Sequence, residues 1–204
     1  MRLAWRAVRF ELALWRSLFL LLTGRRDGRR PGVTTVGYHR AGTGLFVLLL
    51  VASAIEVPAL HLIVPWRPVQ LALPVLGVWG VVFTAGLWAS YVVRPYLISA
   101  DGVRLRHGVH RDLRLSWAQI ADVRERTVRT WAKPGFGTAV AVEDGRLGYV
   151  VHGETNVALL LAEPIVVGGA EVTEVHVGAD DPVALAAALS TRAVKPPAGR
   201  PGRG

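Results

Sequence analysis

Cysteine is absent from this chain of 204 residues, which excludes disulfides, thiolate metal sites and cysteine nucleophiles. The absence also agrees with a soluble part that faces a reducing compartment. The sequence likewise lacks the patterns of phosphate-binding loops, serine hydrolases, zinc proteases and EF-hands. Because no pair of groups suited to acid–base catalysis is present either, we expect neither an enzyme nor a bound cofactor.

Histidine offers one pattern that resembles the start of a metal site, because His107 and His110 have H-x-x-H spacing. Gly108, however, places this pair at the end of a predicted strand and in the loop that follows it, not on a helix. No third ligand lies nearby, and a protein zinc site needs at least three. We therefore expect no metal site.

Negative charge is scarce in the first part of the chain. Residues 1–43 hold nine Arg against Glu11 and Asp27, whereas residues 96–190 hold nine Lys or Arg against twelve acidic residues. A nucleic-acid-binding domain would carry its positive charge on the folded part, so nucleic acid is not expected as a partner. Anionic lipid headgroups are expected, because each Lys or Arg beside the membrane gains about 1 kcal/mol from them.

Two long apolar runs, Leu45 to Pro65 and Val69 to Val93, dominate the first half of the chain. Roughly 20 apolar residues cross the hydrocarbon layer as a helix, so each run predicts a membrane span. The short link between them predicts a tight antiparallel hairpin over residues 44–95. Arginines flank both outer ends of this hairpin and only Arg67 lies in its turn. The positive-inside rule then places both termini in the cytoplasm and the protein in the inner membrane.

The pattern of residues 1–23 predicts an amphipathic helix that lies in the headgroup plane. Its arginines recur at a helical period and fall on one side, while apolar side chains fill the rest. The arginines are Arg2, Arg6, Arg9 and Arg16. A signal peptide fits less well, since Arg16 interrupts the apolar stretch and no cleavage pattern follows. Residues 24–43 are rich in Gly and Arg and predict a basic loop.

The pattern changes after residue 95 to short alternating runs bounded by turns, which is typical of strands. Two Asp-Gly pairs, Asp101-Gly102 and Asp144-Gly145, predict hairpin turns. A long strand is expected from Val157 to Val167, with a bulge at Glu163-Pro164. Asp181 followed by Pro182 predicts the start of a helix. The basic tail 191–204 has too few apolar groups to fold.

This order of elements resembles the bacterial PH-like domains of small membrane proteins. The residues that carry the resemblance are Tyr96–Gly108, Leu115–Val123 and the helix that starts at Asp181, within roughly residues 94–190. The resemblance implies an α+β membrane protein whose part 96–190 is a bent antiparallel β-barrel or sandwich with a capping C-terminal helix. Because this family has no general catalytic residues, the resemblance implies a binding or scaffolding module.

Two polar residues in the first span are candidate functional residues. Glu56 falls near mid-span, where a charge costs at least about 2.5–3.5 kcal/mol, and His61 follows five residues later. Antiparallel pairing sets Glu56 near Trp79, and His61 near Gln70 or Leu73. The two readings of Glu56 are a proton- or ion-linked site and a neutral carboxyl that packs within the hairpin or an oligomer.

Candidate contacts to lipid headgroups come from arginines on both sides of the hairpin. They are Arg25, Arg26, Arg29, Arg30, Arg104 and Arg106. The alternative for the strand arginines is a solvated face that pairs in part with Asp112.

The first hypothesis for function is therefore a membrane-anchored scaffold that binds a protein partner or a second copy of itself. The alternative is an accessory subunit of a transporter or a proton-linked complex that uses Glu56.

Overall fold

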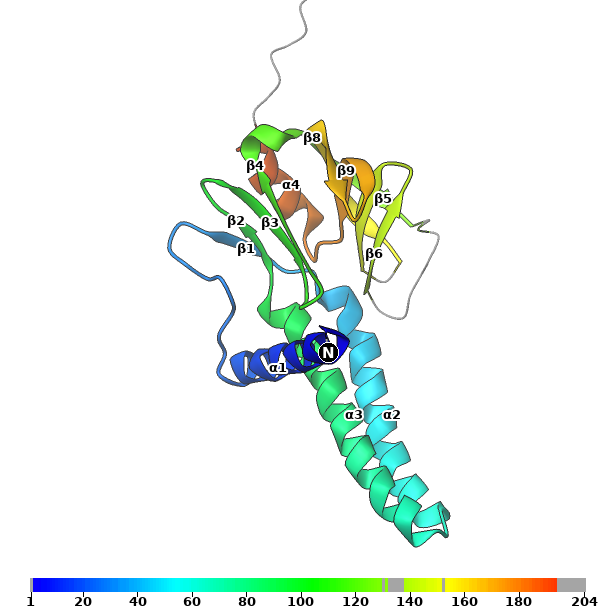
Figure 1. Ribbon diagram of the computed structural model, residues 1–204. Helices are drawn as coiled ribbons and strands as arrows, with labels where there is room; N and C mark the ends of the chain where they lie inside the picture. The colour runs from blue at the N-terminus through cyan, green and yellow to red at the C-terminus, as the bar shows by residue number, and fades with distance from the viewer. Residues whose placement is uncertain (1, 130, 132–137, 152, 194–204) are drawn as a thin grey trace, which may run out of the picture.

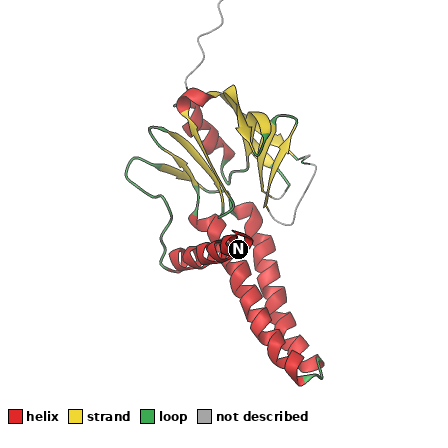
Figure 2. Ribbon diagram, viewed as in Figure 1, coloured by secondary structure: helices red, strands yellow, loops and turns green. Residues whose placement is uncertain are grey.

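The computed structural model describes residues 2–129, 131, 138–151 and 153–193. The chain has three parts: a crosswise N-terminal helix, a long helical hairpin, and a module of two sheets with one helix (Figures 1 and 2). The elements are α1 (Arg2–Leu22), β1 (Thr34–Val36), α2 (Arg40–Ile63), α3 (Arg67–Val93), β2 (Tyr96–Ile98), β3 (Gly102–His107), β4 (Arg111–Ser116), a 3₁₀ turn (Trp117–Gln119), β5 (Ile120–Val128), β6 (Thr138–Glu143), β7 (Arg146–Val151), β8 (Thr155–Val167), β9 (Ala170–Val177) and α4 (Pro182–Ser190).

The predicted hairpin is present as α2 and α3, which pack side by side along their length (Figure 1). Both helices are long and apolar enough to cross a membrane, and only 6% of the most apolar stretch of each is buried. Gly77 allows their close approach, because a side-chain carbon there would collide with Val57. Helix α2 starts at Arg40, whereas the hairpin was expected to start at residue 44.

Strands β1 to β4 form one antiparallel sheet in that order. Its first pair joins β1 to β2, with Val36 opposite Tyr96 and Thr34 opposite Ile98. The whole helical hairpin is therefore the connection between two paired strands. The prediction that residues 24–43 form only a loop was wrong, because Thr34–Val36 form β1. The strand could not be recognised from the local sequence, because β1 is only three residues long and its partner β2 follows the hairpin.

The second sheet has the order β5-β8-β9-β7-β6. Its β6–β7 turn contains Asp144 and Gly145 with φ of 48° and 73°, which are the angles that an Asp-Gly hairpin turn needs. The predicted irregularity in β8 is confirmed by a register shift between Leu160 and Ile165. Pro164 lies in this interval, where the β8–β9 ladder is interrupted. A proline is tolerated there because the ladder needs no N–H from it.

The sheets enclose one core together with α4, but they do not close into a barrel. The 3₁₀ turn after β4 redirects the chain into the second sheet, and among the described strands none pairs across the two sheets. Leu185 and Leu189 of α4 are fully buried in the shared core. Asp181 accepts a hydrogen bond from the N–H of Ala184 and Pro182 follows it, which confirms the predicted helix start.

The predicted tail, residues 191–204, lies outside the described residues from 194 onward.

Candidate functional site

Helix α1 exposes a continuous apolar stripe. Its members recur every three or four residues and are 47–80% exposed: Trp5, Val8, Leu12, Trp15, Phe19 and Leu22. On the other side of the helix, Leu14 and Ser17 are buried at 2% and 0%. Trp15 also lines the pocket between α1 and α3, but at 50% exposure it stays half open like the rest of the stripe. The stripe is therefore left largely uncovered by the hairpin and the sheets, although burying such side chains would stabilise each by about 1.5–3 kcal/mol.

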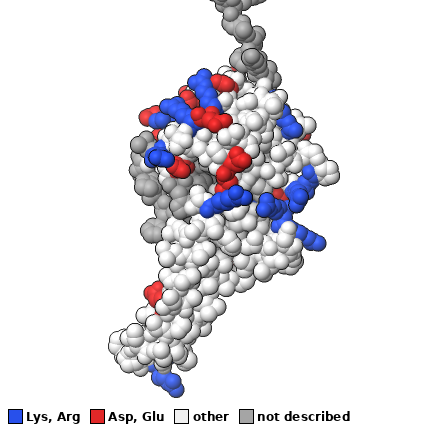
Figure 3. Space-filling view, turned by 180° about the vertical axis from the view of Figure 1, so that it is seen from behind, with Lys and Arg blue, Asp and Glu red and all other residues white. Residues whose placement is uncertain are grey.

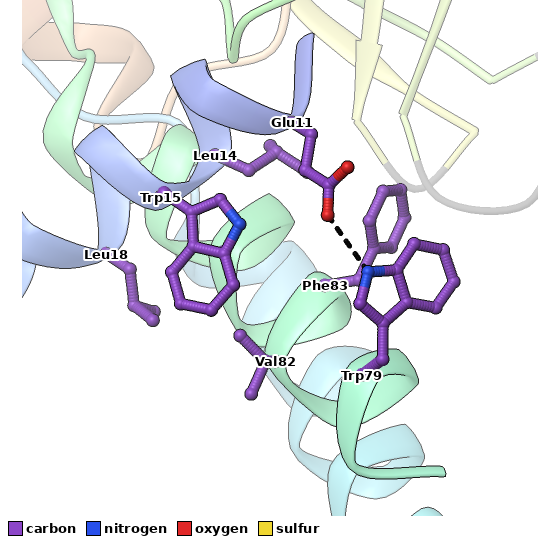
Figure 4. Close-up of a pocket in the computed structure, with 8 residues that line it drawn as sticks. Glu11, Leu14, Trp15, Leu18, Trp79, Val82 and Phe83 are labelled. Atoms are coloured by element: carbon purple, nitrogen blue, oxygen red, sulfur yellow. Dashed lines mark hydrogen bonds between the residues drawn. The ribbon is translucent and has the colours of Figure 1, made fainter. Parts of the chain in front are cut away.

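The buried side of α1 docks on α3 (Figure 4). Leu14 lies against Gly86, where an added side-chain carbon would come within 3.1 Å of the Leu14 Cβ. The indole N–H of Trp79 donates to the Glu11 carboxylate at 2.9 Å, and the rings of Phe10 and Phe83 lie 6.1 Å apart. Trp79, in the middle of α3, therefore has its hydrogen-bond partner on α1.

The two candidate polar residues of the first span differ in their surroundings: His61 pairs with Gln70 of α3, whereas Glu56 is exposed. His61 and Gln70 exchange two contacts, because the Gln70 amide donates to the His61 carbonyl at 2.9 Å and the His61 Nδ1 lies 3.0 Å from the Gln70 carbonyl. The predicted proximity of His61 to Gln70 is confirmed, and the pair joins the two helices near their turn. Glu56 is exposed on α2, so the structure does not bring it together with His61.

The four arginines of the α1–β1 connection, Arg25, Arg26, Arg29 and Arg30, are all exposed. Figure 3 shows a face of the molecule on which charged side chains gather over the sheets and around their junction with the hairpin, while the hairpin itself is nearly free of charge.

The two strand arginines differ sharply in exposure. The Arg104 side chain is 35% exposed and forms a bidentate ion pair with Asp112, so part of the alternative interpretation is realised. Arg106 is 2% exposed and donates to the carbonyls of Pro95 and Asp27. Its guanidinium is held by the backbone and is not free to follow a headgroup as an exposed side chain would.

Asp27 is the centre of a charge cluster that the sequence did not single out. Its carboxylate lies 3.3 Å from Arg106, 3.5 Å from Arg16 and 3.9 Å from Arg94. Arg94 also donates to the hydroxyl of Ser17 at 2.7 Å. Burial lowers the pKa of Arg94 and of Arg106, and the negative charge of Asp27 opposes that shift. The cluster therefore ties α1, the end of α3 and β3 together.

A polar cavity of about 220 Å³ opens beside this cluster. We call it the arginine cavity. Its lining comes from α1, the α1–β1 connection, the end of α3 and the β3–β4 hairpin: Ala13, Asp27, Arg94, Arg104, Arg106, Gly108, Val109, His110, Arg111 and Asp112. The only sequence signal for it was the run of arginines along β3 and β4, because the buried members belong to segments far apart in the chain.

The turn between β3 and β4 shapes one wall of the arginine cavity. Gly108 has φ of 53°, and a side chain there would collide with Ser90 and the ring of Tyr91. The ring of His110 packs against that of Phe10 in α1, with centroids 5.1 Å apart and planes tilted by 39°. Burial lowers the pKa of His110, and the positive charge of Arg111 lowers it further. Across the part of the chain that the structure describes, no three metal-ligating side chains cluster.

The module is fixed to the hairpin by a second set of contacts. The carboxylate of Asp180 accepts from the backbone N–H groups of His39 and Arg40 at 3.3 and 2.8 Å, so it caps the first turn of α2. The Tyr38 hydroxyl accepts from the Gly108 N–H at 2.8 Å. Within the module, the hydroxyl of Tyr96 in β2 donates to the Gly178 carbonyl just after β9 at 3.0 Å and so joins the two sheets.

Comparison of the chain with protein-family models, curated proteins and solved structures finds no match.

Proposed function

We propose that the chain is a membrane-anchored interaction module of the PH-like kind, held at the cytoplasmic face of a bacterial inner membrane. One observation carries the proposal: the exposed apolar stripe of α1 lies crosswise to a hairpin whose surface is also apolar and exposed. A helix that lies in the interface exposes such a stripe to the acyl chains. In this placement α1 lies in the plane of the bilayer with its stripe toward the acyl chains, and the hairpin crosses the bilayer.

The dimensions of α3 support this placement. At 1.5 Å per residue its 27 residues span about 40 Å, and Gly86 lies roughly 29 Å from Arg67. The hydrocarbon layer is about 30 Å thick. With the hairpin inserted, α1 crosses α3 at the edge of that layer. The last two turns of α3 and the arginines beyond it then lie among the headgroups.

Charge supports the orientation. The exposed arginines of the α1–β1 connection lie at the end of the hairpin that carries the module, while the opposite end has Arg67 as the first residue of α3. Anionic lipids and the positive-inside rule favour the arginine-rich end on the cytoplasmic side. The module, with both termini, is accordingly proposed to face the cytoplasm.

The scaffold role is supported by the way the module is attached. Asp180 and Tyr38 join the two parts through hydrogen bonds and not through a free linker. A partner that binds the module would therefore be held in a defined position at the membrane surface. Val166, 76% exposed near the end of β8, offers an apolar contact for such a partner.

Photo-crosslinking in native membranes tests this function. A crosslinking amino acid at Val166 reports on the module, and one at Ile55, 67% exposed on α2, is the matched position on the hairpin. We expect a discrete protein adduct from Val166 and lipid adducts from Ile55. Protein adducts from Ile55 alone would move the interaction into the membrane and reject the scaffold role.

Glu56 supports the second candidate function, an accessory subunit of a proton-linked membrane complex. Its exposure on the outer face of α2 places a carboxyl group where a helix of another subunit could satisfy it, since an intramembrane ionisable group ordinarily pairs. Glu56→Gln would abolish ion-linked activity of such a complex and leave the adduct from Val166 unchanged. A loss of the Val166 adduct in the same variant would contradict the separation of the two roles.

A further inference from the structure

We propose that the arginine cavity binds a phosphate group, and that the headgroup of an anionic membrane lipid supplies it. The choice of a lipid as the source rests on the proposed membrane anchoring. The phosphate chemistry rests on the cavity alone.

The first argument is an imbalance of charge. Asp27 is the nearest carboxylate to three guanidiniums, and the side chains of two of them, Arg94 and Arg106, are only 10% and 3% exposed. Buried cations are costly unless an anion pairs with them. The Arg104 side chain is matched by Asp112. The Arg111 guanidinium has no hydrogen-bond or ion-pair partner among the described residues, although the Arg111 backbone pairs with β3. The cavity therefore has more positive charge than its own acidic groups neutralise.

The second argument concerns which donors remain. Among the described residues, the Arg94 guanidinium has one hydrogen-bond acceptor, the Ser17 hydroxyl, although a guanidinium carries five N–H donors. Arg111 is exposed at the rim, and no side chain or carbonyl of the described residues accepts from its guanidinium. A phosphate oxygen accepts hydrogen bonds from two arginines at once, and charge-assisted bonds of this kind are about twice as strong as neutral ones.

The third argument is space and location. One water molecule needs only about 10–15 Å³ of such space, so a cavity of about 220 Å³ has room for a tetrahedral phosphate and the start of a glycerol chain. Arg94 directly follows the last residue of α3, which places the cavity at the headgroup level in the proposed orientation. Ala13 of α1 forms part of the lining, next to Leu12 of the apolar stripe, so lipid tails would lie beside the bound headgroup.

Native mass spectrometry of the full chain tests the proposal. The chain is reconstituted in nanodiscs of phosphatidylcholine that contain a small fraction of phosphatidic acid, and the lipid that survives release from the disc is counted. We expect one retained phosphatidic acid per chain. Arg111→Gln should weaken its apparent affinity about tenfold, the loss of one charge-assisted hydrogen bond. Arg114→Gln is the matched control, because Arg114 is exposed on the same strand and lies outside the cavity lining.

Two further arms identify the source of the phosphate. Displacement of phosphatidic acid by millimolar inorganic phosphate would support recognition of the phosphate group itself. Oleate, which has charge but no phosphate, should not displace it. Retention of inorganic phosphate but not of phosphatidic acid would support the phosphate site and overturn the lipid source.

The proposal is overturned if wild type and Arg111→Gln retain the same amount of phosphatidic acid, or if Arg114→Gln loses as much as Arg111→Gln. Flotation of the same preparations with lipid vesicles keeps this result separate from the proposed function. A chain that floats but retains no phosphatidic acid rejects the cavity alone, whereas a chain that does not float rejects the membrane anchoring.

Discussion

At the scale of single residues, Asp27 decides how the charges at the junction are balanced. One carboxylate faces three guanidiniums, and it is 31% exposed while two of its partners are nearly buried. The carboxylate lowers the cost of burying Arg94 and Arg106, but it also competes with any anion that enters the arginine cavity. Stability and ligand affinity therefore depend on Asp27 in opposite directions.

Asp27→Asn should lower the stability of the protein in neutral micelles by on the order of 1–3 kcal/mol. This is less than a fully buried pair would lose, because Asp27 is partly solvated. Thermal unfolding measures the loss, and Asp101→Asn on an exposed turn is the control. Phosphate or phosphatidic acid should restore part of the melting temperature in Asp27→Asn and change that of the control no more than that of wild type. Unchanged stability in Asp27→Asn would contradict this account of the cluster.

His110 reports on the electrostatic potential of the same cavity. Burial is the main reason for its lowered pKa, and the charge of Arg111 contributes in the same direction. Arg111→Gln should therefore raise the pKa of His110 but leave it below the usual value of about 6.5. A titration followed by NMR of the imidazole measures the shift, with Arg114→Gln expected to move it less. A fall in the pKa would show that Arg111 does not act on His110 as a neighbouring cation.

The sequence allowed the functional residues to be predicted only where their partners are fixed by local periodicity. The contact of His61 with Gln70 follows from the antiparallel pairing of two helices around a short turn, and it is present. The cluster around Asp27 joins segments almost 80 residues apart, and no local pattern encodes that distance. The burial of Arg106 was not predicted for the same reason. The alternation of residues along a strand does not show which segments cover each face of the sheet.

At the scale of elements, the position of α1 depends on a glycine in α3. Gly86→Leu should force α1 away from α3, because even the first side-chain carbon would lie 3.1 Å from Leu14. Gly80→Leu is the matched control on the same helix, since nothing lies within 4 Å of an added carbon there. Crosslinking between cysteines placed at Glu11 and Trp79 measures the docking. Equal crosslinking in both variants would show that α1 does not depend on this contact.

Elements that are determined by their local sequence were predicted, and those that depend on pairing between distant segments were not. The two apolar helices, the Asp144-Gly145 turn and the cap of α4 were predicted, because composition and local hydrogen bonds determine each of them. The other predicted pair differs, since Asp101 ends the β2–β3 connection and Gly102 is already the first residue of β3. Whether the strands would form a closed barrel or two separate sheets depends on pairing between distant segments. That choice was not fixed by alternation, and the structure shows two sheets.

At the scale of the whole molecule, acid should destabilise the fold below neutrality. Burial lowers the pKa values of His39, His110 and His176; Asp180 and Glu174 oppose the shift at His39 and His176. The unfolded chain therefore takes up protons first as the pH falls below about 6.5, and stability is lost from there down to the folded pKa values. The lowered pKa values of Asp112 and Asp122 act only below about 3.8.

Thermal unfolding in neutral micelles at pH 8 and pH 5.5 measures this loss, with the melting temperature expected to be lower at pH 5.5. A melting temperature that stays constant or rises over this interval would show that these histidines are protonated in the folded state.

The pairing of β1 with β2 also sets an order of events during synthesis. Thr34–Val36 leave the ribosome before the hairpin, and their partners Tyr96–Ile98 leave after it. The β1–β2 pair cannot form until the whole helical hairpin between its two strands has been synthesised. The cap on α2 comes later still, because Asp180 belongs to the last part of the module. Completion of the first sheet therefore follows synthesis of the hairpin, and β1 stays without its partner strand until β2 has been made.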